Sequence, residues 1–213
     1  MLRAISLVYD AGEPTWLLLA REEPEVMAEL IAAVSPLLGD RLYVHAAPVL
    51  EQALRAAGWS LEGRSRHLKM VLTDASAARG RAPEGAVRLG PEDADELLGF
   101  YARAYPGNWF DPRMLATRRY VGLKREGDLV AVAGVHVWSP RQGVAALGNI
   151  ATAPRLRGQG LGTAITAAVC AGLLDEVETI GLNVAADNAP AIACYRRLGF
   201  TVVADYLEGF VVR

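Results

Sequence analysis

One short stretch constrains this chain more than any other, because it predicts a strand that runs into a glycine-rich turn and then a helix. The stretch is N-I-A-T-A-P-R-L-R-G-Q-G-L-G, residues 149–162, and an apolar helical pattern follows it to about Leu174. Gly160 and Gly162 lack a Cβ, so the backbone there can approach a ligand closely. The N–H groups and the positive dipole end of a helix start suit a phosphate or pyrophosphate.

Two arginines, Arg155 and Arg157, add positive charge beside this turn. The pattern is not a P-loop, since no Lys-Ser/Thr pair follows the glycines, and the spacing of a dinucleotide-binding motif is also missing. The stretch therefore indicates an anion-binding loop of another kind. A tight strand-to-helix turn with no ligand is the alternative.

A second segment, D-N-A-P-A-I-A-C-Y-R-R-L-G-F, lies about 30 residues further along, at 187–200. Asn188 is placed to cap a helix, and Gly199 is placed to end it in a left-handed conformation. Tyr195 falls two turns into that helix. On its own, a tyrosine in such a helix is more typical of a core residue than of a catalyst.

The rest of the chain alternates between strand and helix patterns, which indicates a mixed α/β sheet. Residues 74–85 are small, polar and rich in glycine and proline, so they predict a connector between residues 1–73 and 86–213. Strands are expected at 86–89, 119–124, 129–138, 144–152 and 179–185, with two more within 200–213 broken near 205–208. Helices are expected from Pro91, over 160–174 and over 188–198.

Taken together, the two segments resemble those of the GNAT N-acetyltransferase superfamily. Arg157-x-x-Gly160-x-Gly162 matches its Q/R-x-x-G-x-G/A pyrophosphate loop, and Asn188…Tyr195-x-x-x-Gly199-Phe200 matches its second conserved segment. The resemblance covers residues 86–213. It implies a mixed, mostly antiparallel sheet with flanking helices, and an acetyl-CoA-dependent N-acyltransferase. Such an enzyme passes an acetyl group directly to a primary amine in a ternary complex and needs no metal.

The resemblance also implies roles for particular residues. Backbone groups of Ile150, Ala151 and Thr152 would pair with the pantetheine arm, and an amide near Ile150 would stabilise the oxyanion. Tyr195 would protonate the departing CoA thiolate. The remaining residues implied to contact the cofactor are Arg157, Gly158, Gln159, Gly160, Leu161, Gly162, Thr163 and Asn188.

The base that takes the proton from the amine is left open. Some family members carry a glutamate on the central strand, where the expected register places Ala146. His136 and Glu208 are candidates, and His136 has an unperturbed pKa suited to a base, although a hydrogen-bonded structural histidine is the alternative. Because no base is identified, a non-catalytic module that binds or senses acyl-CoA is the competing class of function.

Residues 1–73 repeat part of the same order. Strands are expected at 16–20 and 41–45, helices at 24–38 and 48–57, and an extended segment at 59–73. Gly58-Trp59 can be laid over Gly199-Phe200, so residues 1–73 are hypothesised to be a degenerate half of the same fold. A chance similarity of two amphipathic helices that end in glycine and an aromatic residue is the alternative. Arg21–Val26 lacks a glycine loop, so only one CoA site is expected. Proteins resembling glycine N-acyltransferase combine an atypical N-terminal part with an intact acyltransferase domain in this way.

Composition sets limits on partners and compartment. With 22 basic and 24 acidic side chains the net charge is −2, which argues against a nucleic-acid partner. The longest uncharged run, 158–174, is too short and glycine-rich for a membrane span, and the N-terminus does not look like a signal peptide. Cys170 and Cys194 are expected to be reduced thiols in a cytoplasmic protein. A small-molecule or peptide amine is the expected acceptor, with a homodimer, the acyl length and the acceptor's identity left open.

Overall fold

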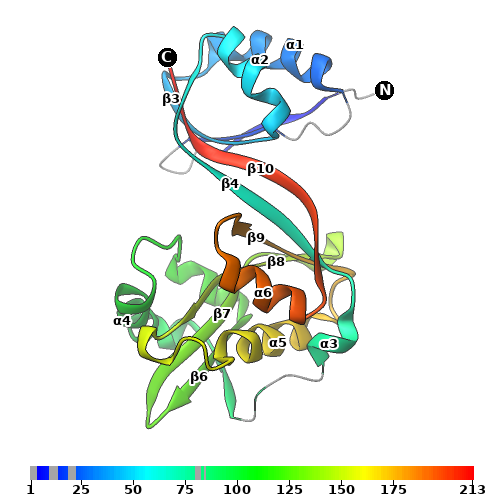
Figure 1. Cartoon of the computed structure of the whole chain (residues 1–213). Helices are drawn as coiled ribbons and strands as arrows, with labels where there is room; N and C mark the ends of the chain where they lie inside the picture. Colours follow the sequence, from blue (N-terminus) through cyan, green and yellow to red (C-terminus); the bar gives the residue numbers. More distant parts are fainter. Residues whose placement is uncertain (1–3, 10–13, 19–22, 80–82, 84) are drawn as a thin grey trace. The chain divides into compact units, whose positions relative to one another are not determined.

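The computed structural model describes residues 4–9, 14–18, 23–79, 83 and 85–213 (Figure 1). Contacts divide the chain into two units. Unit 1 comprises Met1–Lys69, Ala185–Asp187 and Ala204–Arg213, and unit 2 comprises Met70–Val184 and Asn188–Val203. Neither unit is a continuous stretch of sequence, because the long strands β4 (Ser60–Leu72) and β10 (Phe200–Val212) each contribute residues to both.

Unit 2 is built on a mixed sheet with the strand order β4-β9-β8-β7-β6-β5. The chain-adjacent strands from β5 to β8 pair antiparallel, whereas β8 and β9 are parallel. This is the mixed, mostly antiparallel sheet that the sequence predicts. The strand bounds are β5 Ala86–Leu89, β6 Tyr120–Arg125, β7 Asp128–Ser139, β8 Val144–Thr152 and β9 Thr179–Ala185.

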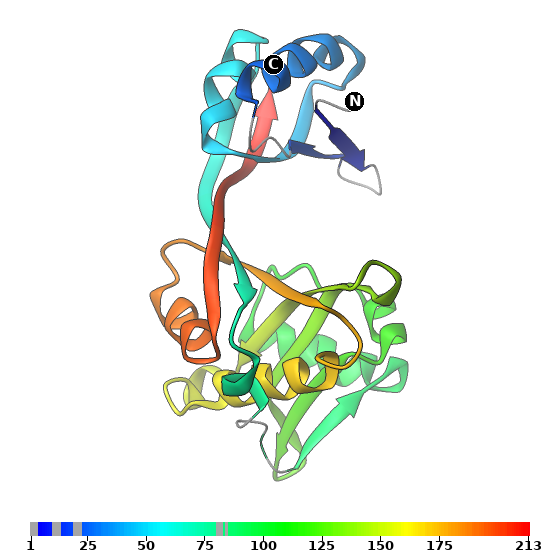
Figure 2. The ribbon, with the colours of Figure 1, turned by 90° about the vertical axis from the view of Figure 1, so that its right-hand side faces the viewer.

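Two helices of unit 2 cover opposite faces of this sheet (Figure 2). Helix α4 (Ala94–Ala104) packs on the face that carries Tyr120 and Val132, while α5 (Leu161–Leu173) packs on the face that carries Val121. Residues 120 and 121 are successive on β6, so their side chains point to opposite sides. Two further helices are α3 (Ala75–Arg79) and α6 (Ala189–Arg197), and α3 packs on α5.

Unit 1 has the strand order β1-β2-β3-β10-β4, with β1 at Ser6–Tyr9, β2 at Thr15–Leu18 and β3 at Arg41–Ala46. Strands β2 and β3 are parallel and are joined by α1 (Pro24–Val34), and β3 pairs antiparallel with β10. A second helix, α2 (Glu51–Ala56), follows β3. The helix-covered core centres on Trp16 and Trp59, whose ring centroids lie 5.9 Å apart.

The secondary structure differs from the sequence expectations in three places. Residues 200–212 form one strand rather than two, because the polar residues that suggested a break have partners: Asp205 accepts a 2.9 Å hydrogen bond from Arg66, and Glu208 accepts bonds from two tyrosines. The expected connector contains α3, in which Ala78 is fully buried. Strand β1 was not predicted.

Several sequence expectations concern residues at the edge of what the structure describes. The predicted strand 16–20 is seen as β2 up to Leu18, and residues 19–22 and 80–82 lie outside the described ranges.

Residues 204–213 belong to unit 1, although the sequence places them in the segment 86–213. Both cysteines are free thiols, and burial raises the pKa of Cys170 to about 12. Within the described ranges, every helix is too short or too polar to span a bilayer.

Candidate active site

The parallel strands β8 and β9 separate partway along their length. Their paired register runs from Val144 opposite Thr179 to Leu147 opposite Leu182. Beyond that pair β8 continues to Thr152, and its residues 148, 151 and 152 remain paired with β7 on the other side. The end of β8 therefore has a neighbouring strand on one side only in the described register. This is the segment in which the sequence places the backbone groups of Ile150, Ala151 and Thr152.

A bulge in β8 lies at the start of this segment. The register with β7 shifts between Gly148 and Ala151, and Asn149 adopts a positive φ of 53°. Asparagine tolerates this left-handed conformation better than most residues do. The bulge bends the strand and changes the direction of the backbone groups that follow it.

Three side chains hold the bulge in place. Tyr101 of α4 donates a 2.6 Å hydrogen bond to the carbonyl oxygen of Asn149, and the Asn149 side-chain amide donates to the Tyr120 hydroxyl at 3.0 Å. The Tyr120 hydroxyl in turn donates to the sulfur of Met114 at 3.3 Å. Burial raises the pKa of Tyr101, and it raises the pKa of Tyr120 to about 12, so both hydroxyls stay protonated. Asn149 is 5% exposed, and the network is part of the core under α4.

The glycine turn follows directly. After a short 3-10 turn at Pro154–Leu156, Gly158 and Gly160 have φ values of 78° and 80°, and Gly160 is the N-cap of α5. Both are exposed, and a Cβ at either position would meet no atom within 4 Å, so the requirement for glycine comes from the backbone conformation. Among the residues that the structure describes, no side chain caps α5. The N–H groups of its first turn are thus available to an anionic ligand.

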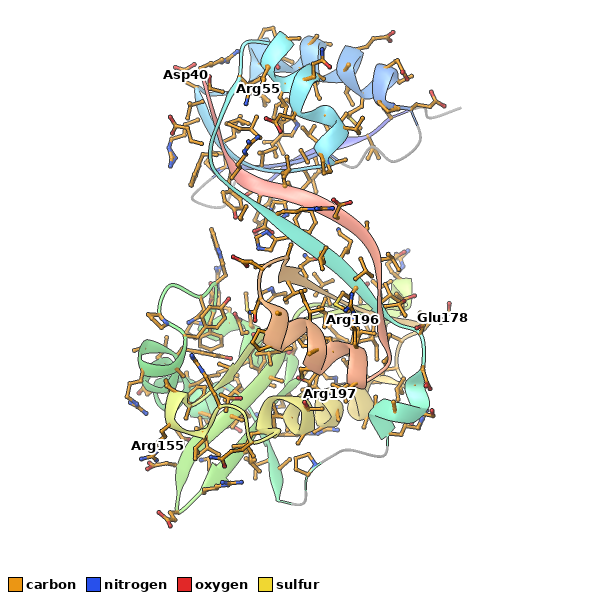
Figure 3. The ribbon with its side chains drawn as sticks, in the orientation of Figure 1. Asp40, Arg55, Arg155, Glu178, Arg196 and Arg197 are labelled. Atoms are coloured by element: carbon orange, nitrogen blue, oxygen red, sulfur yellow. The ribbon has the colours of Figure 1, made fainter. Side chains whose placement is uncertain are left out.

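Arg157 and Gly162 tie the turn to the rest of unit 2. The Arg157 guanidinium donates to the carbonyl oxygen of Ala104 at the end of α4, at 2.9 Å, and to that of Thr152 at 3.4 Å. A Cβ on Gly162 would lie 3.4 Å from the Thr152 hydroxyl. Arg157, predicted as a cofactor contact, therefore braces the loop through backbone carbonyls. Arg155 is exposed on the same loop (Figure 3).

Helix α6 lies beside the start of α5. Thr163 in the first turn of α5 donates a hydrogen bond to the sulfur of Cys194 at 3.2 Å, and the two helices are in contact. Asn188 caps α6, with its side-chain oxygen accepting from the N–H of Ala191 at 3.2 Å. Gly199 ends the helix with a φ of 94°. The predicted cap and stop are confirmed, and the Asn188 side-chain oxygen has a structural partner.

Tyr195 is 8% exposed, and its ring packs against Phe200 with centroids 6.0 Å apart. Its hydroxyl makes no hydrogen bond to any residue that the structure describes. Burial raises the pKa of Tyr195, and the neighbouring Cys194 and Tyr105 act in the same direction. The hydroxyl is therefore protonated at neutral pH and free to donate.

The two candidate bases lie in different units. His136 is the extra residue of a bulge in β7, and a Cβ on Gly148 would collide with its imidazole, so the ring lies over β8 just before Asn149. The His136 side chain is exposed. Glu208 belongs to unit 1, where it lies between two histidines and two tyrosines.

Comparison with known proteins shows the family to which the chain belongs. Residues 88–200, just over half of the chain, match the family model described as the acetyltransferase (GNAT) family. The chain belongs to the GNAT acetyltransferase family. It is 31% identical over 166 residues to a mycothiol acetyltransferase of Clavibacter michiganensis subsp. michiganensis, an alignment that covers 64% of this chain and 51% of the relative. The chain thus spans about half the length of that curated relative.

Solved structures share the fold of this member of the GNAT family. A GNAT-family acetyltransferase from Novosphingobium aromaticivorans has a TM-score of 0.64 and 24% identity, covering 86% of this chain and 80% of that one. A tandem GNAT protein from the clavulanic acid biosynthesis pathway has a TM-score of 0.61 and 18% identity, covering 95% and 75%. At these identities the likeness establishes the fold only.

The structure adds residues that the sequence did not single out. Asn149 lies in the first motif, but the resemblance implies no role for it, and the tyrosines that hold it, Tyr101 and Tyr120, lie in neither motif. The sequence signal that could have pointed to Asn149 is an amide side chain within a mostly apolar strand. Among the described residues, no group of three or more His, Cys, Asp or Glu side chains is arranged to hold a metal ion.

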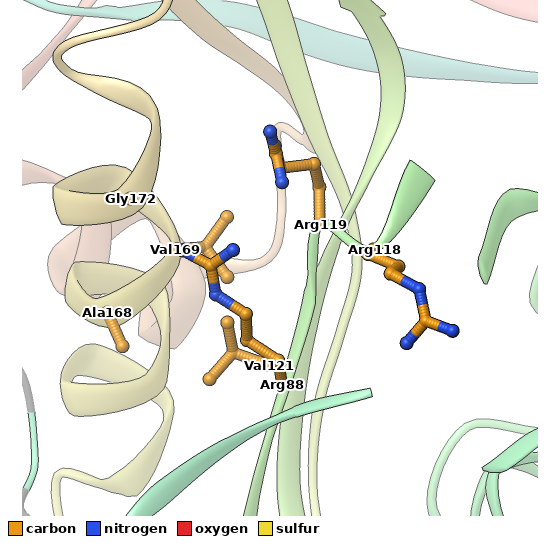
Figure 4. Close-up of a pocket in the computed structure, with 7 residues that line it drawn as sticks. All are labelled: Arg88, Arg118, Arg119, Val121, Ala168, Val169 and Gly172. Atoms are coloured by element: carbon orange, nitrogen blue, oxygen red, sulfur yellow. The ribbon is translucent and has the colours of Figure 1, made fainter. Parts of the chain in front are cut away.

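A small cavity of about 40 Å³ on the far part of α5 is separate from these features (Figure 4). Two of its three arginines already have carboxylate partners, since Arg118 pairs with Glu92 at 2.9 Å and Arg119 with Glu176 at 2.8 Å. We therefore do not assign the cavity as a second anion-binding site. Its lining comprises Arg88, Arg118, Arg119, Val121, Ala168, Val169 and Gly172.

Proposed function

We propose that this GNAT acetyltransferase transfers the acetyl group of acetyl-CoA to a primary amine by direct attack in a ternary complex. The observation that carries the proposal is the course of β8, which leaves β9 after Leu147, bulges at Asn149 and leads into the glycine turn before α5. One continuous stretch of backbone thereby offers strand-type groups followed by helix-start N–H groups. These suit an amide-containing arm and a pyrophosphate respectively.

In this proposal the pantetheine arm pairs with Ile150, Ala151 and Thr152. The pyrophosphate lies on the N–H groups of the glycine turn, with Arg155 contributing charge and Arg157 keeping the turn in shape. Asn188 contributes from the start of α6 while capping it. The N–H groups proposed for the pyrophosphate are those of Gly158, Gln159, Gly160, Leu161, Gly162 and Thr163.

The chemistry follows from these positions. The amine nitrogen forms a bond to the thioester carbonyl carbon, and a backbone N–H near Ile150 stabilises the developing oxyanion. The C–S bond then breaks, and the CoA thiolate takes a proton from the Tyr195 hydroxyl. The proton lost by the amine passes to His136, which we propose as the base because its imidazole lies over β8 beside the bulge. A thiolate leaves reasonably well unassisted, so the contribution of Tyr195 is modest.

We also propose that residues 1–73 are a degenerate half of the same fold. In support, unit 1 has two parallel strands joined by a helix, β2-α1-β3, followed by α2 and β4, which repeats the order β8-α5-β9-α6-β10 of unit 2. The repeat is of the kind expected in glycine N-acyltransferase-like proteins. In this half, Arg21–Val26 is expected at the position that the glycine loop has in unit 2. Residues 21 and 22 of that segment lie outside the described ranges, and α1 begins at Pro24.

The acceptor is proposed only as a small-molecule or peptide primary amine. The curated relatives carry the name mycothiol acetyltransferase, but the chain covers about half of the first of them. The cytoplasmic location and the homodimer stay predictions.

Release of free thiol from acetyl-CoA, measured with a panel of amines, tests the proposed function. We expect one class of amine to stimulate release and to be recovered as its N-acetyl derivative. Tight binding of CoA without stimulation by any amine would favour the competing role as an acyl-CoA-binding or sensing module. Crystals grown with CoA would then show which side chains line the space beside the sulfur.

The assignment of His136 is tested separately with His136→Gln. We expect a large loss of kcat with little change in the KM for acetyl-CoA, and partial recovery when imidazole is added to the assay. Equal activity of this variant and the unaltered enzyme across the pH range would exclude His136 as the base.

A further inference from the structure

A cluster of polar and aromatic side chains lies on one face of the unit 1 sheet. Along β3, Leu42 and Val44 are buried in the core beneath α1 and α2, so the alternating residues Tyr43 and His45 point to the opposite face. Neighbouring strands place further side chains beside them. The Glu208 cluster, as we call it, consists of Tyr43 and His45 from β3, His67 and Lys69 from β4, and Tyr206 and Glu208 from β10.

The Glu208 carboxylate is the centre of the cluster, and its side chain is 16% exposed. One oxygen accepts from the Tyr206 hydroxyl at 2.6 Å and lies 3.5 Å from Nδ1 of His45. The other accepts from the Tyr43 hydroxyl at 3.0 Å and lies 3.4 Å from Nε2 of His67. Burial and the carboxylate raise the pKa of Tyr206, so its hydroxyl remains a donor. The negative charge is thus held in one position by neutral donors.

Aromatic rings stand around this carboxylate. His45 is stacked on Tyr206 with centroids 5.4 Å apart and planes 12° apart, and Tyr43 meets His45 edge-on at 5.4 Å. Partly buried negative charge combined with the faces of aromatic rings is the environment that attracts an organic ammonium group. The half-buried environment weakens solvent screening and strengthens that attraction.

The chain itself supplies an ammonium group at this place. The Lys69 ammonium lies 5.3 Å from the centroid of the Tyr206 ring. Lys69 is an exposed residue, so its side chain can move away without uncovering a core. The only other lysine, Lys124, belongs to unit 2 and pairs with Glu96 at 2.7 Å. Lys69 therefore marks a cation position on the ring face of the cluster.

We infer that the Glu208 cluster binds the protonated amine of a small organic ligand, which takes the position of the Lys69 ammonium against Tyr206. Replacing one ammonium by another leaves the net charge of the cluster unchanged, so the exchange carries no penalty from an added charge. The ligand class rests on the proposed function, in which an amine is consumed. The site itself lies wholly within unit 1 and requires neither CoA nor turnover.

The histidines provide a direct test on the full chain. There are three, of which His45 and His67 lie in the cluster and His136 lies in unit 2. We expect butylammonium, added without CoA, to shift the imidazole NMR signals of His45 and His67. Butanol is the matched neutral probe and is expected to shift none of them. Equal shifts with butanol, or no shift at His45 and His67, would overturn the inference.

Three variants sharpen the test. Lys69→Met removes the internal competitor and is expected to tighten butylammonium binding by about tenfold, whereas Lys124→Met leaves it unchanged. Glu208→Gln keeps the size of the side chain but removes its charge, and is expected to weaken binding by at least about tenfold. If Glu208→Gln does not fold, Tyr206→Leu, which removes the ring face, serves instead. The inference would also be overturned if Lys69→Met and one of the single variants Glu208→Gln or Tyr206→Leu each bound butylammonium with the affinity of the unaltered protein.

This test separates the two proposals. If the protein binds butylammonium but transfers no acetyl group to any amine, the proposed function is refuted and the amine site stands. If it transfers acetyl groups but butylammonium shifts neither His45 nor His67, the amine site is refuted and the proposed function stands.

Discussion

The hydroxyl of Tyr101 donates a hydrogen bond of 2.6 Å to the backbone carbonyl oxygen of Asn149. This bond joins helix α4 to the single residue at which β8 turns away from regular geometry, with a φ of 53°. The Asn149 side chain is bound separately, to Tyr120 of β6. The bulge is therefore held by two neighbouring elements, and the backbone proposed to face the thioester depends on side chains outside either sequence motif.

Replacing Tyr101 with phenylalanine should reveal this dependence. The variant leaves a buried carbonyl oxygen without its partner, which costs about 1–3 kcal/mol in the free energy of unfolding. Under conditions in which the variant is fully folded, we still expect kcat to fall, because the backbone N–H proposed to stabilise the oxyanion shifts. Chemical unfolding and steady-state kinetics on the same preparation give both values. A destabilised variant with wild-type kcat would show that the bond serves folding only.

The glycine turn is tested by comparing two glycines at either end of α5. Gly160→Ala forces a side chain into a left-handed conformation at a cost of about 1–2 kcal/mol, although the added Cβ has open space. We expect affinity for acetyl-CoA, measured by calorimetry, to fall by about tenfold as the N–H groups are redirected.

Gly172→Ala is the matched control for that comparison. Gly172 lies inside the same helix, and its Cβ would also meet nothing within 4 Å. Alanine there should stabilise the protein by up to about 1 kcal/mol and leave acetyl-CoA affinity unaltered. Similar affinities for the two variants would remove the turn from the binding site.

Tyr195→Phe should separate catalysis from folding. Its hydroxyl has no hydrogen-bond partner among the described residues, so we expect the free energy of unfolding to be nearly unchanged. The value of kcat should fall toward the lower end of the ~10²–10⁴-fold range of general acid catalysis, with KM for acetyl-CoA preserved. Because burial raises the pKa of Tyr195 above its usual value, this group should cause no loss of activity below about pH 10. A rise in KM with unchanged kcat would assign Tyr195 to binding.

His45 predicts a pH dependence of stability. Burial lowers the pKa of His45, and this effect outweighs the opposite influence of Glu208. The unfolded chain then binds a proton more readily than the folded chain. The stabilisation is therefore present above about pH 6.5, and it is lost as the pH falls through the lower pKa of the folded state. Urea unfolding across this range should show a weaker dependence in His45→Gln, and an identical dependence would contradict the assignment.

The local features of unit 2 could be predicted from the sequence because each depends on residues close together in the chain. The cap at Asn188, the stop at Gly199 and the left-handed glycines before α5 are all local backbone requirements. The bulge could not be predicted in the same way. Its position depends on the register between β7 and β8 and on a helix almost fifty residues earlier, since Tyr101 and Asn149 are 48 residues apart.

The Glu208 cluster shows the same limit more strongly. Each of its strands contributes an i, i+2 pair, such as Tyr43 with His45, which a period-of-two pattern places on one face. Nothing local shows that these pairs meet, because Tyr43 and Glu208 are 165 residues apart. For the same reason the polar residues of β10 predicted a break in the strand, whereas their partners on other strands keep it continuous.

The division of β10 between the two units has a consequence for how the chain folds. Val44 of β3 pairs with Gly209, so the sheet of unit 1 is unfinished until a strand made much later in synthesis arrives. Until then one edge of β3 lacks its neighbour, and an unpaired strand edge is a site of aggregation. The helices α1 and α2 can form early on local contacts, but their sheet cannot. Nascent chains stalled before residue 204 should therefore bind chaperones, and release should follow once β10 has left the ribosome.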